Sequence, residues 1–380
     1  MANTELGSDL VLQPATPDQV LVTWQRHRVE WGKGLTPEQY LDRERLLATR
    51  EFTSDNLTVY VLVPRADPTT LEPLAHCDVF RRPGARIAAG STVTVTEGDV
   101  YSIASVFCPP STRGQGYAST MMSQLYQILR SKPGCIGSNL YSDVGPTFYA
   151  RKGWQTYASR TVVVPVAADG PAVAASIERL DRAAALALSE ADCQRFKQAL
   201  FAMAARLEPG SATALPASYF AIFPTAASYD WHWARATFLA AIYNQAPPTI
   251  FGVRLSNPKP INATELTATD SYVLWFHDMV KEELIALRTH VAHRADSPAL
   301  VAAMLAEARR YGFKRIAFWQ LHEPALSPFR DHVLAVDQLD PRWGAHVVER
   351  EDSLPGLADF GAQEAEAPCE WLCDDRYAWV

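Results

Sequence analysis

The feature that most constrains the fold is an apolar strand that runs into a glycine-containing turn and then a helix. Residues 100–108 are apolar, aromatic and β-branched, which indicates a strand. Two prolines follow and end this strand, because proline has no backbone N–H for a β-ladder. Residues 113–118, with two glycines, then open a helix that we expect to reach about residue 130. A strand over 135–141 would lie parallel to the first across this helix.

The turn at 113–118 has the properties of a phosphate site. Its small residues let backbone N–H groups approach a ligand, and the following helix presents free N–H groups and the positive end of its dipole. The lysine of a P-loop is missing, and the glycine spacing differs from the dinucleotide-binding fingerprint. The turn alone therefore leaves the kind of phosphate ligand open.

Two motifs resemble a known family. Arg113-x-x-Gly116-x-Ala118 matches the acetyl-CoA signature Arg/Gln-x-x-Gly-x-Gly/Ala of the GNAT N-acetyltransferases, and Phe148-Tyr149-x-x-x-Gly153-Trp154 resembles their second signature. The resemblance covers roughly residues 8–165. It implies acetyl-CoA as co-substrate, direct acetyl transfer within a ternary complex, and no metal.

Three longer blocks resemble one group within this family. They are residues 140–154, residues 350–355 and the Tyr-Ala-Trp sequence at 377–379, and they are similar to the fungal lysine N-acetyltransferases. This resemblance covers nearly the whole chain. It implies that the acceptor is the side-chain amine of lysine or a similar small amine, without settling which one.

Length and composition limit the remaining possibilities. A chain of 380 residues predicts two domains. The net charge of −7 argues against a broad nucleic-acid surface. The polar N-terminus lacks a signal core, and no apolar run reaches the length of a membrane span. Six cysteines without zinc-type spacing favour free thiols in a reducing compartment. We expect a cytoplasmic enzyme, monomeric or homodimeric.

The order of predicted elements defines an α/β (α+β) chain with two domains. The resemblance implies an N-terminal GNAT fold with a splayed mixed sheet over residues 1–166. A helical linker over 167–209 would follow, and then a second domain over 210–380. Its strand, strand, strand, helix, strand pattern predicts a degenerate GNAT-like domain that caps the acceptor site. Residues 288–298 lack the acetyl-CoA signature, so we expect no second acetyl-CoA site.

The resemblance also assigns the acetyl-CoA contacts. The backbone of the first strand would hold the pantetheine arm and polarise the carbonyl, and the turn would hold the pyrophosphate. The predicted contacts are Val106, Phe107, Cys108, Arg113, Gly114, Gln115, Gly116, Tyr117 and Ala118.

The sequence offers one candidate for the catalytic acid and several for the catalytic base. The resemblance assigns the general acid to Tyr149, next to the departing thiolate. The strand position where many relatives carry a glutamate has no carboxylate here, so Asp99 and Asp143 are the candidate bases. Asp143 would alternatively cap the short helix that follows it or bind the substrate ammonium. A water chain is a further alternative to a single base.

Several other residues have two interpretations. Arg81, Arg82 and Arg350 are candidates for binding an acceptor carboxylate or are surface charges, and the Val380 carboxylate would reach the site if the C-terminal residues dock there. His76 and the Trp-His-Trp sequence at 231–233 are interpreted as packing residues. Two other functions stay open: a protein or peptide acetyltransferase, and an acetyl-CoA-binding protein without catalysis.

Overall fold

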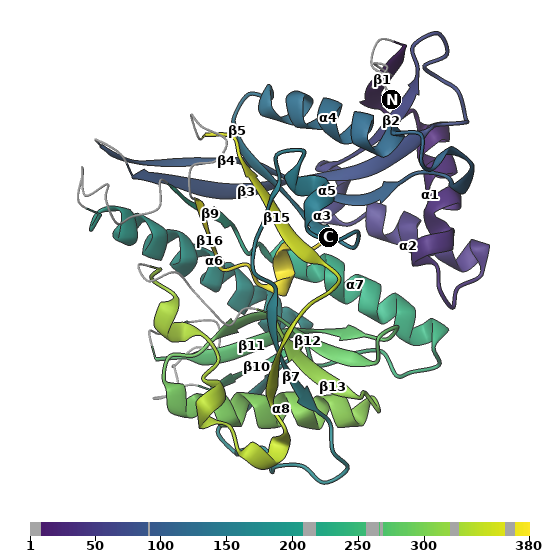
Figure 1. The fold of residues 1–380 in the computed structure, drawn as a ribbon. Helices are drawn as coiled ribbons and strands as arrows, with labels where there is room; N and C mark the ends of the chain where they lie inside the picture. Colours follow the sequence, from purple (N-terminus) through teal and green to yellow (C-terminus); the bar gives the residue numbers. More distant parts are fainter. Residues whose placement is uncertain are drawn as a thin grey trace.

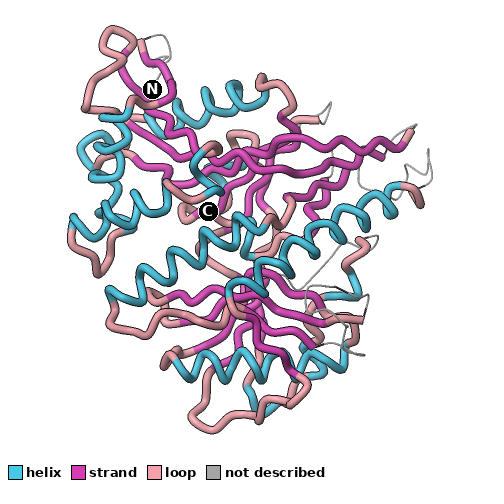
Figure 2. The backbone as a smooth tube through the Cα atoms, turned by 180° about the vertical axis from the view of Figure 1, so that it is seen from behind, coloured by secondary structure: helices cyan, strands magenta, loops and turns pink. Residues whose placement is uncertain are grey.

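A computed structural model describes residues 9–89, 92–207, 218–255, 266, 269–319, 327–361 and 369–380. Two β-sheets lie one above the other, with helix α7 (Ala226–Ile242) running between them (Figure 1). The C-terminal end lies near the centre of the molecule in both views (Figures 1 and 2). The two halves therefore meet over a shared interior.

Within the described residues, the first sheet has nine strands and the second has seven. The first contains β1 (Leu10–Pro14), β2 (Leu57–Pro64), β3 (Ala75–Ala89), β4 (Val93–Phe107), β5 (Cys135–Ser142), β6 (Gln155–Thr156), β9 (Ser218–Ile222), β15 (Leu354–Asp359) and β16 (Cys369–Leu372). The second contains β7 (Arg160–Pro165), β8 (Ile177–Leu180), β10 (Gly252–Leu255), β11 (Ser271–Asp278), β12 (Glu283–His290), β13 (Arg315–Phe318) and β14 (His346–Glu349).

Helices cover both faces of the first sheet. The helices besides α7 are α1 (Pro17–Trp31), α2 (Pro37–Ala48), α3 (Glu51–Ser54), α4 (Tyr117–Arg130), α5 (Thr147–Ala150), α6 (Arg182–Ala204) and α8 (Ser297–Arg310). Helix α4 buries four apolar side chains against one face of the sheet, whereas α1, α2 and α7 lie on the other face (Figure 1). Both α1 and α2 begin with a threonine capping box and a proline in the first turn, which their sequences predict.

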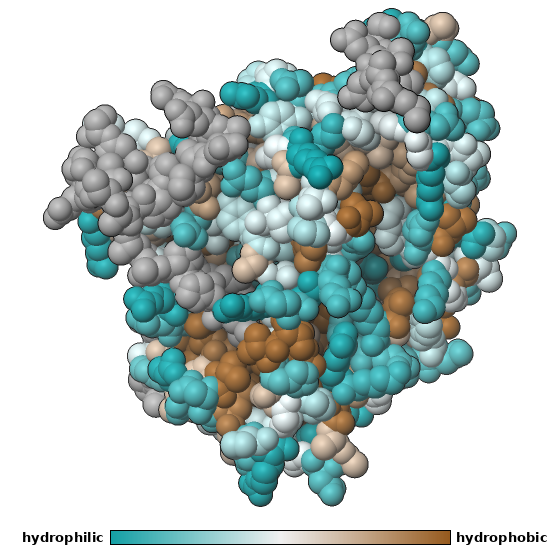
Figure 3. Space-filling view, in the orientation of Figure 1, coloured by the Kyte–Doolittle hydropathy of each residue, from teal (hydrophilic) through white to brown (hydrophobic). Residues whose placement is uncertain are grey.

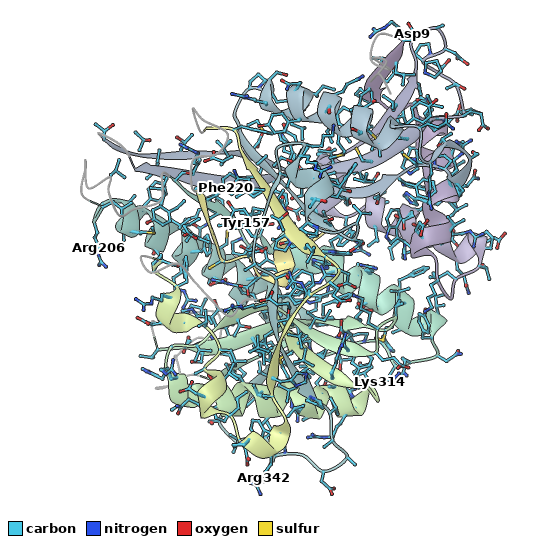
Figure 4. The ribbon with its side chains drawn as sticks, viewed as in Figure 1. Asp9, Tyr157, Arg206, Phe220, Lys314 and Arg342 are labelled. Carbon is cyan, nitrogen blue, oxygen red and sulfur yellow. The ribbon has the colours of Figure 1, made fainter. Side chains whose placement is uncertain are left out.

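The predicted division of the chain does not coincide with the sheets. Strand β7, predicted to close the first domain, pairs in the second sheet, while β9, β15 and β16 come from the C-terminal half and pair in the first. Within the predicted linker 167–209, β8 precedes the long helix α6, and residues 208–209 lie outside the described residues. Tyr157 and Phe220, labelled in Figure 4, pack in an apolar cluster that includes side chains of both sheets.

The second sheet repeats part of the order of the first. Strands β10, β11 and β12 are antiparallel neighbours, and β12 pairs parallel with β13 across helix α8. This matches β4, α4 and β5 in the first sheet. The predicted strand at 315–321 is present as β13, and its last two residues lie outside the described residues.

Pro83 and Gly84 are typical turn residues, and their sequence predicts a turn, but the structure has none there. Strand β3 continues through both residues and pairs with β4 along almost its whole length. Strand β9 pairs antiparallel with the other edge of β3, starting at Gly84. A Cβ atom at position 84 would lie 2.6 Å from the Ala221 carbonyl oxygen. Glycine is therefore needed for close strand approach rather than for a turn.

The variant Gly84→Val tests this explanation. We expect the free energy of unfolding to fall by about 2–3 kcal/mol, because the new side chain meets the β9 backbone. Thr94→Val, at an exposed position of β4, adds the same side chain without that contact and should change stability by less than about 0.5 kcal/mol. Urea denaturation measures both. Equal effects of the two variants would contradict the explanation.

Candidate active site

A gap opens between β4 and β5 at the carboxyl end of β4. The parallel pairing of the two strands ends at Ile103 and Leu140, although β4 continues to Phe107. Beyond that point β5 still pairs with β15 on its other edge. Ser105 has a φ of 51°, which turns the β4 backbone out of the regular strand conformation. Residues 104–107 therefore present backbone groups that β5 does not use.

The glycine turn lies at the same end of β4. Helix α4 begins at Tyr117, four residues later than predicted, because Gly114 and Gly116 have left-handed φ angles of 78° and 85°. The first N–H groups of a helix have no intrahelical partner. One of them, the Ala118 N–H, donates to the Cys108 thiol. A Cβ atom at Gly114 would contact nothing within 4 Å, so the turn is open on that side.

Arg113 ties this turn to the rest of the domain. Its guanidinium donates to the Cys108 carbonyl at 3.0 Å and forms an ion pair with Glu30 at 2.6 Å. The guanidinium also lies 5.6 Å from the centre of the Phe107 ring. A phosphate contact of Arg113 stays a prediction, as do the other acetyl-CoA contacts.

Tyr149 lies on α5 and is buried next to the gap. Burial raises the pKa of its phenol well above the usual range, and the nearby Cys77, Asp143 and Cys108 raise it further. The hydroxyl is therefore protonated at neutral pH and able to donate a proton. The acid role stays a prediction.

The rest of the second signature is structural. Trp154 is fully buried, and its indole N–H donates to the Ser138 hydroxyl at 3.1 Å. Gly153 has a φ of 103° and lies against the Tyr126 ring, where a Cβ atom would clash. Phe148 packs in the same core. Phe148 and Trp154 are therefore core residues.

The two predicted bases lie far apart. Asp143 is exposed, and its carboxylate accepts from the Ser353 N–H at 2.9 Å instead of capping α5, so the predicted cap is wrong. Asp99 lies in the middle of β4 and pairs with Cys135, where the pairing of β4 with β5 begins. At about 3.3 Å per residue, Asp99 lies roughly 16 Å along the strand from Ala104, where the gap begins. This distance leaves Asp143 as the predicted base on the gap side.

The C-terminal residues dock on the sheet beside the gap. Arg82 of β3 is 1% exposed and donates to the carbonyls of Tyr377 at 3.1 Å and Ala378 at 2.8 Å. Val380 packs against the apolar cluster that also contacts Ala104 of β4. The C-terminal residues are therefore docked rather than frayed, while a catalytic role of the Val380 carboxylate stays a prediction.

The three predicted carboxylate-binding arginines are engaged elsewhere. Arg82 holds the C-terminal residues, and Arg81 binds the Asn56 side chain. Arg350 lies 3.8 Å above the Trp319 ring and donates to the Thr161 hydroxyl. Each of these arginines therefore has a structural partner within the chain.

His76 and the Trp-His-Trp sequence at 231–233 are packing residues, as their sequence context predicts. His76 is fully buried, with its Nε2 atom 3.2 Å from His27 Nδ1. Trp231, His232 and Trp233 are buried on α7, as predicted for packing residues.

Sequence reasoning missed two charged residues near the gap. Asp78 lies on β3 opposite Ala104, and Arg235 lies on α7. A lone acid among apolar strand residues was the available signal for Asp78. The helical pattern around Arg235 carries no comparable signal.

The described residues contain neither a membrane-spanning helix nor a metal-binding group of side chains. Within the ranges that the structure describes, no helix is long and apolar enough to cross a membrane. In the same ranges, no group of three or more His, Cys, Asp or Glu side chains is arranged to hold a metal ion.

Comparisons with known proteins identify both halves. A family model described as the LYC1 GNAT-like C-terminal domain matches residues 161–380, and one described as the acetyltransferase (GNAT) family matches residues 37–152. A lysine acetyltransferase of Yarrowia lipolytica is 26% identical over 351 residues, covering 80% of this chain and 83% of that protein. The uncharacterized protein YGR111W of Saccharomyces cerevisiae is 28% identical over 155 residues, covering 33% and 38%.

The fold has a counterpart among solved structures. A conserved protein of unknown function from Enterococcus faecalis V583, described as a probable N-acyltransferase, has a TM-score of 0.53 at 10% identity. The match covers 92% of this chain and 71% of that chain. The predicted fold, a GNAT domain followed by a GNAT-like domain, is confirmed. The C-terminal model starts at residue 161, which agrees with the place of β7 in the second sheet.

Arg82→Met tests how the C-terminal residues are held. The loss of two buried hydrogen bonds should lower the free energy of unfolding by about 2 kcal/mol or more and speed amide exchange over residues 369–380. Arg81→Met removes a neighbouring exposed arginine and should change neither quantity appreciably. Unchanged exchange in Arg82→Met would show that other contacts hold these residues.

Proposed function

Since the chain belongs to the family with the LYC1 GNAT-like C-terminal domain and is a GNAT N-acetyltransferase, we propose that it acetylates the primary amine of lysine or a lysine-like small molecule. Acetyl-CoA is the donor in this proposal. The lysine acetyltransferase of Yarrowia lipolytica supports the choice of acceptor. We also propose a cytoplasmic location, which the six free cysteines support.

The docking of residues 376–380 beside the gap is the observation that carries this proposal. Tyr377 and Ala378 are fully buried between the two halves, and Trp379 packs against the same apolar cluster as Val380. The chain's own residues therefore fill much of the side on which an acceptor would approach. Such a site favours a small amine over an extended protein segment.

The donor side fits the cofactor that the family uses. Acetyl-CoA supplies an activated acetyl thioester. The backbone at 106–108 would hold its pantetheine arm in the gap, because it has no β5 partner. The first N–H groups of α4 and the positive end of its dipole would hold the pyrophosphate.

Tyr149 acts as the general acid in this proposal. Its raised pKa keeps the hydroxyl protonated until the thiolate departs. Tyr149 and Cys108 pack in the same apolar cluster, near the end of β4. The tyrosine then gives its proton to the sulfur and regains one from the amine nitrogen.

Incubation with acetyl-CoA and a panel of amines, with release of free CoA as the readout, tests the function. We expect turnover with lysine and related diamines. Turnover with lysine-containing peptides but not with free amines would favour a protein acetyltransferase. Acetyl-CoA binding without turnover across the panel would instead favour a non-catalytic protein.

Tyr149→Phe tests the acid role. We expect kcat to fall about 100-fold while the affinity for acetyl-CoA is retained, because only proton donation is lost. Tyr126→Phe removes a hydroxyl from a tyrosine that packs on Trp154 and should leave kcat within about twofold. Steady-state kinetics and a binding titration measure these effects. A kcat equal to that of the wild type in Tyr149→Phe would rule out this acid.

A further inference from the structure

We propose that the acceptor is bound between α2, β3 and α7 by two opposite charges, with Asp78 taking the ammonium and its proton and Arg235 holding the carboxylate. The inference rests on the proposed function and specifies the acceptor. It predicts an amino acid with a side-chain primary amine rather than a simple alkylamine.

Asp78 is placed to meet an amine at the gap. It lies on β3 opposite Ala104, where β4 has just lost its β5 partner. Neighbouring strands are about 4.8 Å apart, so Asp78 is one strand away from the free β4 backbone. Its side chain shares a sheet face with His76 and Arg82, because residues two apart in a strand point the same way. That face is turned toward α1, α7 and the docked C-terminal residues.

Asp78 lacks the partner that a buried carboxylate needs. It is 6% exposed, and its Oδ1 atom has no hydrogen-bond partner among the described residues. The Ser105 hydroxyl donates to the carboxylate and lowers its pKa in part. An unpaired buried charge is costly, and an ammonium at this place would remove the cost.

The pKa of the Asp78 carboxyl lies near neutral pH. Burial is the main cause, Glu44 of α2 adds to it, and together with the Ser105 hydrogen bond they give a pKa of about 7. Tyr40 of α2, Cys77 of β3 and the neutral His76 complete the titratable groups near it. The nearest acid, Glu44, is already paired with Arg43. A carboxyl that titrates near neutral pH is suited to accept a proton from an amine.

Arg235 supplies the opposite charge. Its guanidinium lies 5.2 Å from the centre of the Trp379 ring and 5.9 Å from that of Phe276. Within the described part of the chain it makes no hydrogen bond or ion pair, whereas Arg43 on the facing helix is engaged by Glu44 and the Trp31 carbonyl. Burial, and then Arg43, lower the pKa of Arg235, whereas Asp278, Glu44 and Tyr40 raise it. An acceptor carboxylate beside the guanidinium would further offset the effects of burial and Arg43.

Tyr40 connects the two charges. Burial raises the pKa of the Tyr40 phenol, Asp78 also raises it and Arg235 lowers it, so both charges act on the same ring. The surface is recessed at the level of α7 between the two halves (Figure 3). An acceptor amino acid would place its side-chain ammonium at Asp78 and its carboxylate at Arg235.

The reaction balances with these residues. The acceptor ammonium gives one proton to the Asp78 carboxylate, and the free amine nitrogen forms a bond to the acetyl carbon. The carbon–sulfur bond breaks, the thiolate takes the Tyr149 proton, and Tyr149 regains a proton from the new amide nitrogen. The proton on Asp78 then leaves to solvent. The products are the acetylated amine, free CoA and one proton.

Arg235→Met tests the carboxylate contact. The substrates are lysine and cadaverine, which is the same diamine without the carboxylate. We expect kcat/KM for lysine to fall about 10- to 100-fold and that for cadaverine to stay within about threefold. The cadaverine rate shows that the variant is folded. Arg45→Met, on the exposed side of α2, should change neither rate. An equal loss for both substrates would overturn the contact.

Asp78→Asn tests the proton acceptor. In the wild type we expect kcat/KM for both amines to fall as the pH drops through about 7, because Asp78 must be ionised. The variant should lose about 100-fold in kcat and lack this acidic limb. The acidic limb should persist in both Asp143→Asn and Glu38→Gln. A limb that persists in Asp78→Asn, or disappears only in Asp143→Asn, would overturn the assignment.

Stability supplies a readout that does not require turnover. The pKa of Asp78 is about 7 in the folded protein and 3.8 ordinarily, so the folded state binds more protons between these values. Wild-type stability should therefore fall, relative to Asp78→Asn, as the pH rises from about 4 to about 7. A difference that stays constant over this range would contradict the burial of an unpaired carboxyl.

Failure of the proposed function has a different signature. A wild-type protein that binds acetyl-CoA but acetylates neither lysine nor cadaverine would overturn the function and this inference together. Turnover of both amines by the wild type, with lysine and cadaverine equally affected in Arg235→Met, would overturn only the inference.

Discussion

The loss of β4–β5 pairing after Ile103 is the constraint on which the rest of the structure depends. Parallel neighbours normally satisfy each other's backbone groups, and here those of residues 104–107 are left to other partners. Because β15 pairs with the far edge of β5, β5 stays in the sheet although it diverges from β4. The gap is thus maintained by a strand from the opposite half of the chain. The glycine turn, Tyr149 and Asp78 all lie around this opening.

Each half of the chain contributes strands to the sheet of the other half. This exchange holds the acetyl-CoA side and the acceptor side of the proposed site together. The first sheet receives β9, β15 and β16, and the second receives β7. A buried ionic network reinforces the junction, where Arg288 of β12 binds both Asp192 of α6 and Asp375 near the C-terminal end. Together with Arg82, this network sets the position of the last residues relative to the gap. The degenerate second domain therefore contributes by holding those residues.

Local signals made much of the donor side predictable from sequence. The glycine turn between an apolar strand and a helix, and the capping boxes at Thr16 and Thr36, depend on neighbours within a few residues. Strands β9, β15 and β16 escaped prediction because they are short and pair with segments far away in the chain. Pro83 and Gly84 are typical turn residues, but the pairing of β9 with β3 keeps them in a strand. The proposed roles of Asp78 and Arg235 could not be predicted from the sequence, because they depend on elements that are far apart in the chain.

The place of β15 in the first sheet has a consequence for biosynthesis. A chain that leaves the ribosome in order completes β1 to β5 long before Leu354 is made. Until then the outer edge of β5 is an open strand edge, which is prone to pair with other chains. Nascent chains would need protection from aggregation during this interval. Messages truncated before this point would give products without a finished sheet instead of a smaller working enzyme.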